Sequence, residues 1–430
     1  MAAGELRLLS AAEIAARVNG RDLGAQEIVR EHVEALAELT PLNALLADCG
    51  EQAVERAAAP VSGPLAGVPL LVKDLFDTAG MRTTYGSSIF SDHVPAGTAR
   101  AVTLLEEAGA IVIGKANLHE FAWGTTSQNP HFGFVQNPVR PGKSPGGSSG
   151  GNGAALAANV SALGLGTDTG GSVRIPSACC DTVGFKPSFG KVPIEGCFAL
   201  SSSFDHVGPM ARTVRDCALA YSVLSGEPVA EPRAEGLVVG LLEQAPRASP
   251  HEPSSTGPEV AESWLPREGI ERVAAQLEEL GARVVEAALP EPEAQIVPLF
   301  LFEAAVAHRE FFPAQRDRYG PDTQLKWDAA HKVPAIDVYE AQQALPRWRE
   351  VAAREPAVDI FLCPVLGLAI PDQDVWEPDI RVQMTSYTRG FNYLGWPAIA
   401  IGGFQLAGRD DATVLSLGLA WEDAFGRSET

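Results

Sequence analysis

Two glycine- and serine-rich stretches have the residue types and spacing that could do chemistry. Residues 144–151 read SPGGSSGG, and residues 166–176 read GTDTGGSVRIP. Both stretches carry few charges, and a run of small residues at 154–158 lies between them, which predicts a buried, closely packed backbone. Consecutive glycines let backbone N–H groups converge without hindrance from Cβ atoms. The pattern therefore predicts a site that stabilises an anion or a developing oxyanion.

Several common motifs are incomplete in this region. Residues 142–144 resemble the end of a phosphate-binding loop, but the first glycine of that loop would fall on Asn137. Residues 164–169 nearly spell GxGxxG but end in Thr169. His119 and Glu120 are followed by no second histidine four residues on, and the six cysteines form no CxxC pair. The sequence therefore predicts no metal site.

One generic motif is complete. Residues 147–151 satisfy GxSxG, the nucleophile elbow of α/β-hydrolases, with Ser149 as the nucleophile. That elbow needs an apolar strand directly before it, whereas residues 141–145 contain two prolines and cannot form a central strand. The hydrolase-elbow interpretation is therefore disfavoured.

The surrounding elements must position these stretches. The apolar run 68–72 predicts a buried strand that ends at Lys73, a helix follows from Thr98 to Ala108, and residues 111–113 form the next strand. This strand–helix–strand order predicts an at least partly parallel sheet covered on both faces. Further predictions are helices over 10–58 (opened by a capping box from Ser10 to Glu13) and 268–280, strands over 283–289, 360–365 and 398–401, and a flexible stretch over 244–262.

Taken together, Lys73 and the two stretches resemble the amidase signature family of serine hydrolases. Ser148 follows Lys73 by 75 residues and Ser172 follows Ser148 by 24, and the similarity extends over about 60–225. The resemblance implies an α/β amidase-signature fold: a large, twisted, mixed β-sheet, partly parallel and covered by helices on both faces. We expect one domain over 1–430, with the signature core at about 60–225 and a peripheral, cap-forming region at about 230–345.

The resemblance also implies a Ser–Ser–Lys triad. Ser172 would be the nucleophile, Ser148 the bridging serine on a cis peptide, and Lys73 the terminal base. A lysine accepts a proton near neutral pH only when burial lowers its pKa from about 10.4. The apolar residues before Lys73 offer such surroundings.

Other positions follow from the same resemblance. Ser149, Asp168 and Arg174 would brace the site, although a buried ion pair or hydrogen-bonded core explains them equally well. Phe121, Ala122 and Trp123 lie where relatives line the acyl pocket, and the two aromatics could equally be core residues. Residues 299–312 could supply a lid or a core helix. The oxyanion hole would consist of consecutive backbone N–H groups, those of Thr169, Gly170, Gly171 and Ser172.

Two functions stay open from the sequence. The favoured one is an amidase that hydrolyses a small-molecule carboxamide to a carboxylate plus ammonia or an amine, through an acyl-enzyme on Ser172. The alternative is the glutaminase (A) subunit of a tRNA-dependent amidotransferase. It ranks second because no arginine can be placed for the α-carboxylate of glutamine and because the acidic composition gives no sign of a surface that faces tRNA.

Composition bounds the partners and the location. The chain has 430 residues, of which 46% are apolar and 20% charged, so a sizeable core is available. The formal net charge of −21 disfavours binding to nucleic acids and anionic membranes. We expect a small amide as the partner, with no nucleic acid and no membrane, and leave a homodimer open. The proposed chemistry needs no cofactor, and scattered cysteines favour the cytoplasm.

Overall fold

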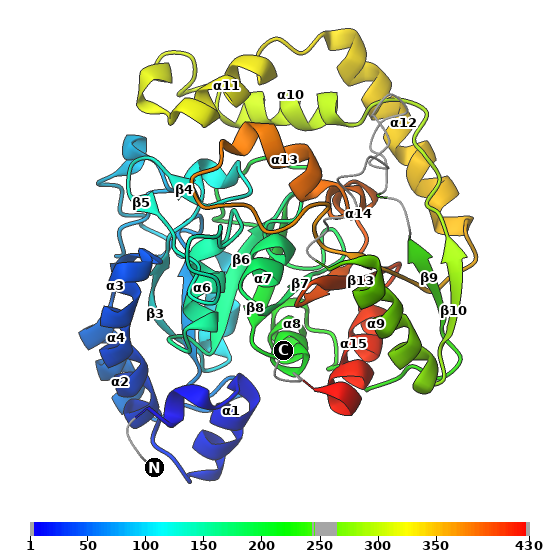
Figure 1. Cartoon of the computed structure of the whole chain (residues 1–430). Coiled ribbons are helices and arrows are strands. Elements are labelled where there is room, and N and C mark those ends of the chain that lie inside the picture. Colours follow the sequence, from blue (N-terminus) through cyan, green and yellow to red (C-terminus); the bar gives the residue numbers. More distant parts are fainter. Residues whose placement is uncertain (1–3, 243–244, 246–264, 427–430) are drawn as a thin grey trace.

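The computed structural model describes residues 4–242, 245 and 265–426. Within them, an 11-stranded sheet forms the centre of the molecule (Figure 1). In spatial order its strands are β1 (Leu45–Asp48), β3 (Ile111–Ala116), β2 (Pro69–Lys73), β6 (Leu163–Asp168), β8 (His206–Ala211), β7 (Val183–Lys186), β12 (Ala398–Ile401), β13 (Phe404–Gly408), β11 (Ile360–Pro364), β9 (Val238–Leu242) and β10 (Arg283–Ala287). A separate two-stranded sheet pairs β4 (Gln128–Asn129) with β5 (Gly133–Phe134).

The large sheet is mixed, as expected. Strands β3, β2 and β6 are parallel neighbours, and so are β11, β9 and β10, whereas the strands between these two groups pair antiparallel. The helices are α1 (Ala11–Gly20), α2 (Ala25–Ala35), α3 (Leu39–Leu42), α4 (Gly50–Ala58), α5 (Arg100–Glu107), α6 (Gly150–Ala157), α7 (Arg174–Cys179), α8 (Val214–Ser225), α9 (Arg267–Glu279), α10 (Val297–Ala307), α11 (Pro321–Ala330), α12 (Ala335–Arg354), α13 (Glu377–Thr385), α14 (Arg389–Leu394) and α15 (Asp411–Phe425).

Helices cover both faces of the sheet. On β7, Phe185 packs against Tyr221 of α8, with ring centroids 5.1 Å apart. The neighbouring Gly184 faces the other way, where a Cβ atom would meet Ser177 of α7. Since successive side chains of a strand point to opposite faces, α8 and α7 lie on opposite sides of the sheet. The expected fold class is confirmed.

The structure confirms some of the predicted helix features and contradicts others. The capping box at the start of α1 is present, with the Glu13 N–H donating to Ser10 and the Ser10 N–H donating to Glu13. The expectation of helix throughout 10–58 is wrong at β1, which pairs antiparallel with β3. Apart from residue 245, the stretch 244–262 predicted to be flexible lies outside the described residues.

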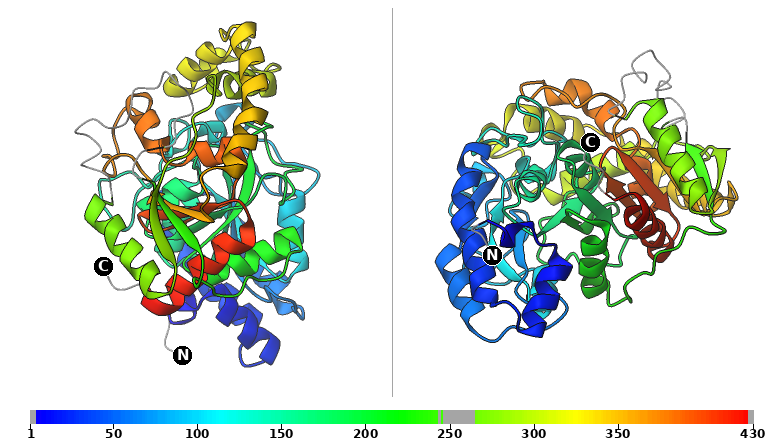
Figure 2. Two further views of the ribbon diagram at one scale, coloured as in Figure 1. Left: turned by 90° about the vertical axis from the view of Figure 1, so that its right-hand side faces the viewer. Right: turned by 60° about the horizontal axis from the view of Figure 1, so that its bottom comes forward.

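The region predicted to form a cap contributes to both sheet and periphery. It supplies β9 and β10 to the sheet edge, while α10, α11 and the start of α12 lie together at one end of the molecule, beside α13 (Figures 1 and 2). The division into a signature core and a peripheral region stays a prediction.

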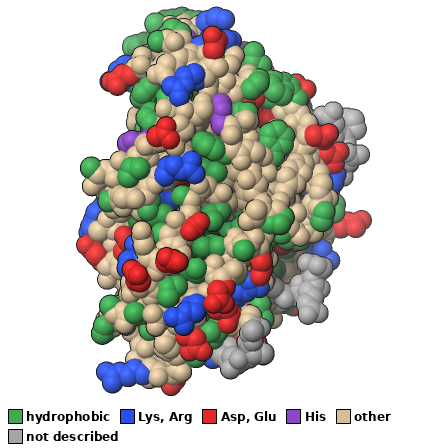
Figure 3. All heavy atoms as spheres, turned by 90° about the vertical axis from the view of Figure 1, so that its left-hand side faces the viewer, with side chains coloured by type: hydrophobic (Ala, Val, Ile, Leu, Met, Phe, Trp, Pro, Cys, Tyr) green, Lys and Arg blue, Asp and Glu red, His purple; other side chains and the backbone are tan. Residues whose placement is uncertain are grey.

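Surface charge is spread rather than gathered on the face drawn in Figure 3, where acidic and basic side chains are interspersed. In the part of the chain that the structure describes, no helix is both long and apolar enough to cross a bilayer.

Candidate active site

Strand ends and helix starts bring the predicted residues together. Lys73 is the last residue of β2, and Asp168 is the last residue of the parallel neighbour β6, so their carboxyl ends meet at one edge. Ser148 lies just before α6, and Ser172 lies just before α7. Ligand sites in open α/β sheets form at such carboxyl ends.

Lys73 and Ser148 are in direct contact. The Lys73 Nζ donates to Ser148 Oγ at 2.7 Å and to Thr167 Oγ1 at 2.7 Å. The Lys73 side chain is fully buried, and this burial lowers the pKa of its amine to about 7. The amine is therefore poised to exchange a proton near neutral pH.

The two serine segments are also linked. The peptide bond between Gly147 and Ser148 is cis, as the resemblance implied. The N–H of Ser149 donates to the carbonyl oxygen of Ser172 at 3.2 Å, which holds the start of α6 against the turn before α7. Gly147 is needed there because a Cβ atom would lie 2.8 Å from the backbone nitrogens of Thr126 and Ser127.

Of the three predicted triad residues, only Ser172 lines the neighbouring cavity. This cavity has a volume of about 130 Å³. Lys73 and Ser148 are fully buried, whereas 8% of Ser172 is exposed. Ser149 is fully buried and its hydroxyl donates to the carbonyl of Thr167, so it is less suited than Ser172 to attack a substrate.

The turn that precedes Ser172 is held by Asp168. Its carboxylate accepts from the backbone N–H groups of Gly171 at 2.8 Å and Val173 at 3.2 Å. Since the Gly171 N–H is already used in this way, the structure does not support its predicted place in an oxyanion hole. The oxyanion role of the Thr169, Gly170 and Ser172 N–H groups stays a prediction.

Asp168 and Arg174 form a fully buried ion pair. The Arg174 Nε and Nη2 each lie 3.0 Å from a different oxygen of the Asp168 carboxylate. Burial alone would raise the pKa of Asp168, but Arg174 outweighs it and holds that pKa well below its usual range. Asn392 and Gln405 complete the contacts by accepting from the other Arg174 hydrogens at 2.7 and 3.0 Å.

We predict that Asp168→Ala costs about 3–5 kcal/mol of unfolding free energy, because the Arg174 charge would remain buried without its partner. Denaturant unfolding followed by tryptophan fluorescence measures this. The control is Asp372→Ala, since Asp372 pairs with Lys143 at the surface and should leave stability nearly unchanged. A loss below about 1 kcal/mol for Asp168→Ala would contradict the bracing role.

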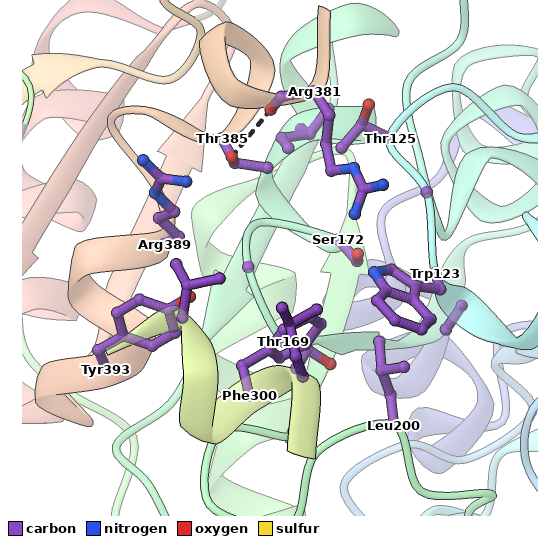
Figure 4. Close-up of a pocket in the computed structure, with 16 residues that line it drawn as sticks. Trp123, Thr125, Thr169, Ser172, Leu200, Phe300, Arg381, Thr385, Arg389 and Tyr393 are labelled. Carbon is purple, nitrogen blue, oxygen red and sulfur yellow. Dashed lines mark hydrogen bonds between the residues drawn. The ribbon is translucent and has the colours of Figure 1, made fainter. Parts of the chain in front are cut away.

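The cavity wall combines backbone, apolar and basic groups (Figure 4). Ala122 and Trp123 contribute to it as predicted, but Phe121 is not among its lining residues. The Phe121 ring instead packs in an aromatic cluster with Phe198 and Tyr319, with centroids 5.3 and 5.4 Å away. Three residues of α10 also line the cavity, namely Val297, Phe300 and Leu301.

Sequence patterns did not predict two arginines that lie in the cavity wall. Arg381 from α13 and Arg389 from α14 both line the cavity, and in Figure 4 the Arg381 guanidinium points toward Ser172 and Trp123. The Arg381 guanidinium lies 5.9 Å from the centroid of the Trp123 ring. Neither arginine lies in a recognisable motif. Among the described residues, no group of three or more His, Cys, Asp or Glu side chains is arranged to hold a metal ion.

Comparisons with known proteins identify relatives across most of the chain. The family profile described as Amidase matches residues 23–416. A curated relative from Maridesulfovibrio salexigens, named as the A subunit of a Glutamyl-tRNA(Gln) amidotransferase, is 38% identical over 73% of this chain and 67% of its own length. The chain spans about two thirds of the length of this and the next curated relatives, which have the same name.

Solved structures agree with this fold. One titled "Crystal structure of amidase" is 32% identical, with a TM-score of 0.84 and coverage of 97% of this chain and 99% of that one. The A subunit of the Glutamyl-tRNA(Gln) amidotransferase of Thermotoga maritima is 26% identical, with a TM-score of 0.79 and coverage of 98% and 96%.

The relatives correct our expectation about partners. We expected a small amide as the partner, no nucleic acid, no membrane and, as an option, a homodimer. Those curated relatives are instead named as one subunit of an amidotransferase, and that name includes a tRNA. Net charge had argued against nucleic acids, but it is a sum over the whole surface and does not describe the charge of any one part of it. The match over residues 23–416 shows that the chain belongs to the amidase family and is an enzyme of the amidase signature group.

Proposed function

We propose that this chain releases ammonia from the side-chain amide of glutamine, as the glutaminase subunit of a tRNA-dependent amidotransferase. The names of the curated relatives support this alternative over the stand-alone amidase that we first favoured. The observation that carries it is the cavity, which Ser172, Arg381 and Arg389 all line. Glutamine has an amide at one end and a carboxylate at the other, and guanidinium groups bind carboxylates with strong charge-assisted hydrogen bonds.

In this proposal, Ser172 attacks the amide carbon. Its hydroxyl proton passes to Ser148, and the Ser148 proton passes to the neutral amine of Lys73. The C–N bond then breaks as the nitrogen takes a proton back along the same route, which releases ammonia and leaves an ester on Ser172. Water hydrolyses the ester by the same proton path, giving the carboxylate. The 2.7 Å contact between Lys73 and Ser148 supports the last step of the relay.

The oxyanion formed during attack needs hydrogen-bond donors. We assign this role to the backbone N–H groups of Thr169, Gly170 and Ser172, and a bracing role to Ser149, Asp168 and Arg174. The carbonyl of Gly170 accepts from Thr388 Oγ1 at 2.6 Å, which holds the turn from its other side. Preorganised donors of this kind typically contribute about 2.7–4 kcal/mol each to transition-state stabilisation.

We also propose that the chain works in the cytoplasm as one amidase domain. The six cysteines are present as thiols, and five of them are buried, as is usual for proteins of reducing compartments.

A substrate panel tests the proposed function. The purified chain is incubated with glutamine, asparagine, an aliphatic amide and an aryl amide, and ammonia release is measured. We expect glutamine to be hydrolysed most efficiently. Rapid hydrolysis of the uncharged amides with glutamine inert would overturn the glutaminase proposal and restore the stand-alone amidase interpretation.

Arg381→Ala should raise the KM for glutamine about 10- to 100-fold and change kcat much less. The physical reason is the loss of a charge-assisted hydrogen bond, worth roughly 1.5–3 kcal/mol, to a group remote from the reacting amide. Steady-state ammonia release measures both constants. The matched control is Arg347→Ala, which removes an exposed arginine paired with Glu293 at the surface. An unchanged KM in Arg381→Ala would exclude a direct contact with the substrate.

A further inference from the structure

A buried ionic cluster lies behind the cavity wall and outside the Ser–Ser–Lys triad. It contains His119, Asp322, Lys326 and Glu377, with Arg381 at its edge. The Asp322 carboxylate lies 2.8 Å from both His119 Nε2 and Lys326 Nζ, and the Glu377 carboxylate lies 2.8 Å from Lys326 Nζ. These groups come from the loop before the cavity wall, from α11 and from α13.

The cluster joins α11 to the segment that forms the wall. The Lys326 Nζ donates to the carbonyl oxygen of Trp123 at 2.6 Å. At the start of α11, the Gly320 N–H donates to Glu120 at 2.7 Å, and the Thr323 hydroxyl donates to the same carboxylate. Since Glu120 and Trp123 belong to one short segment, α11 holds that segment at two points.

The other half of the cluster reaches the arginine in the cavity. One oxygen of the Glu377 carboxylate faces Lys326, and the other accepts from the backbone N–H and the hydroxyl of Thr125 at 3.1 Å each. This second oxygen also lies 3.5 Å from Arg381 Nε. Burial alone would raise the pKa of Glu377, but Lys326 and then Arg381 outweigh it, so this pKa is held low and the carboxylate stays charged.

We propose that Lys326 is a positioning residue for substrate recognition: its ammonium group holds the Trp123 carbonyl and the carboxylates of Asp322 and Glu377, and so fixes Trp123 and Arg381 in the cavity wall. The Lys326 side chain is 3% exposed, so its three polar contacts take the place of water. The inference rests on the proposed function in placing the substrate in this cavity, with an anionic group near Arg381 and Ser172 as the reacting serine.

Electrostatics predicts what happens to Arg381 when the Lys326 charge is removed. Without the Lys326 charge, Arg381 becomes the nearest cation to the buried Glu377 carboxylate. A buried carboxylate is costly unless it is paired, so Glu377 should draw the guanidinium away from the cavity. Recognition of an anionic substrate would then suffer, whereas the reacting groups around Ser172 would keep their places.

The test compares two reagents that sulfonylate an active-site serine. One is benzenesulfonyl fluoride and the other is 4-(fluorosulfonyl)benzoic acid, which adds a carboxylate. In Lys326→Met, we expect labelling of Ser172 by the carboxylate reagent to slow about tenfold and labelling by the neutral reagent to stay within about twofold. In the double variant Lys326→Met/Glu377→Gln, the rate at which the carboxylate reagent labels Ser172 should return to within about threefold of the parent rate.

Further variants and readouts separate the outcomes. Lys332→Met removes a similar charge from the exposed residues after α11 and should leave both rates unchanged. If Lys326→Met does not fold, the single variant Glu377→Gln is the test. Because it removes a negative charge beside Arg381, the ratio of the labelling rate with the carboxylate reagent to that with the neutral reagent should rise at least threefold over the parent. Equal slowing of both reagents, or an unchanged ratio, would overturn the positioning role. Failure of the parent to hydrolyse glutamine would refute the proposed function but leave this ratio as a valid test.

Discussion

Replacing Ser172 with alanine is expected to reduce amide hydrolysis by at least about 10⁴-fold and to leave the free energy of unfolding nearly unchanged. The variant lacks the attacking oxygen, so no acyl-enzyme can form, and what remains comes from binding and the oxyanion donors. The change removes one hydroxyl at the cavity wall and leaves the buried Asp168–Arg174 pair intact. Ammonia release measures the loss, and denaturant unfolding measures the stability.

Ser149→Ala is the matched control for Ser172→Ala. Ser149 occupies the nucleophile position of the GxSxG pattern, but its hydroxyl faces the Thr167 carbonyl. We expect its activity to stay within about tenfold of the parent. A fluorophosphonate probe followed by peptide mass spectrometry should label Ser172 in both the parent and Ser149→Ala. Label on Ser149, or activity of Ser172→Ala within tenfold of the parent, would contradict the assignment of the nucleophile.

The strand that carries Lys73 could be predicted because its signal is local, whereas the helices α6 and α7, which follow Ser148 and Ser172, were not predicted. The apolar run before Lys73 is buried on both faces in β2, and the strand at 398–401 has the bounds that the sequence suggested. The strand β1 was missed because it is a short edge strand of partly buried residues, and only its pairing with β3 distinguishes it from the helices around it. Local pattern therefore identifies buried strands better than edge strands.

The substrate pocket could be predicted only in part, because its residues come from distant parts of the chain. Arg381 and Arg389 reach the cavity from helices more than 200 residues after Ser172. A single arginine in a helix has no local pattern that marks it as a binding residue. Phe121 was predicted to line the cavity because it lies close to Trp123 in the sequence. Its ring instead packs into the core. Residues two positions apart in a short loop can therefore face opposite ways.

Lys73→Met should reduce kcat/KM about 10²- to 10⁴-fold at neutral pH, the usual contribution of a general base. It should also remove the pH dependence that Lys73 imposes. With a pKa of about 7, the amine is mostly protonated below pH 7 and cannot accept the proton from Ser148. The parent should therefore lose about tenfold in kcat/KM for each pH unit below 7 and reach a plateau above it, whereas the variant should be nearly flat between pH 6 and 8.

The pH profile distinguishes a base from a residue that only fills space. Methionine keeps the length of the lysine side chain and is apolar, so the fully buried position should accept it with little loss of stability. The control Lys143→Met removes an exposed lysine that pairs with Asp372, and it should keep both the rate and the profile of the parent. If Lys73→Met retained an inflection near pH 7, another group would be the base, and the proton path through Ser148 would have to end elsewhere. A flat profile with a stable fold would place the titrating proton on Lys73, because no other part of the site would have changed its charge.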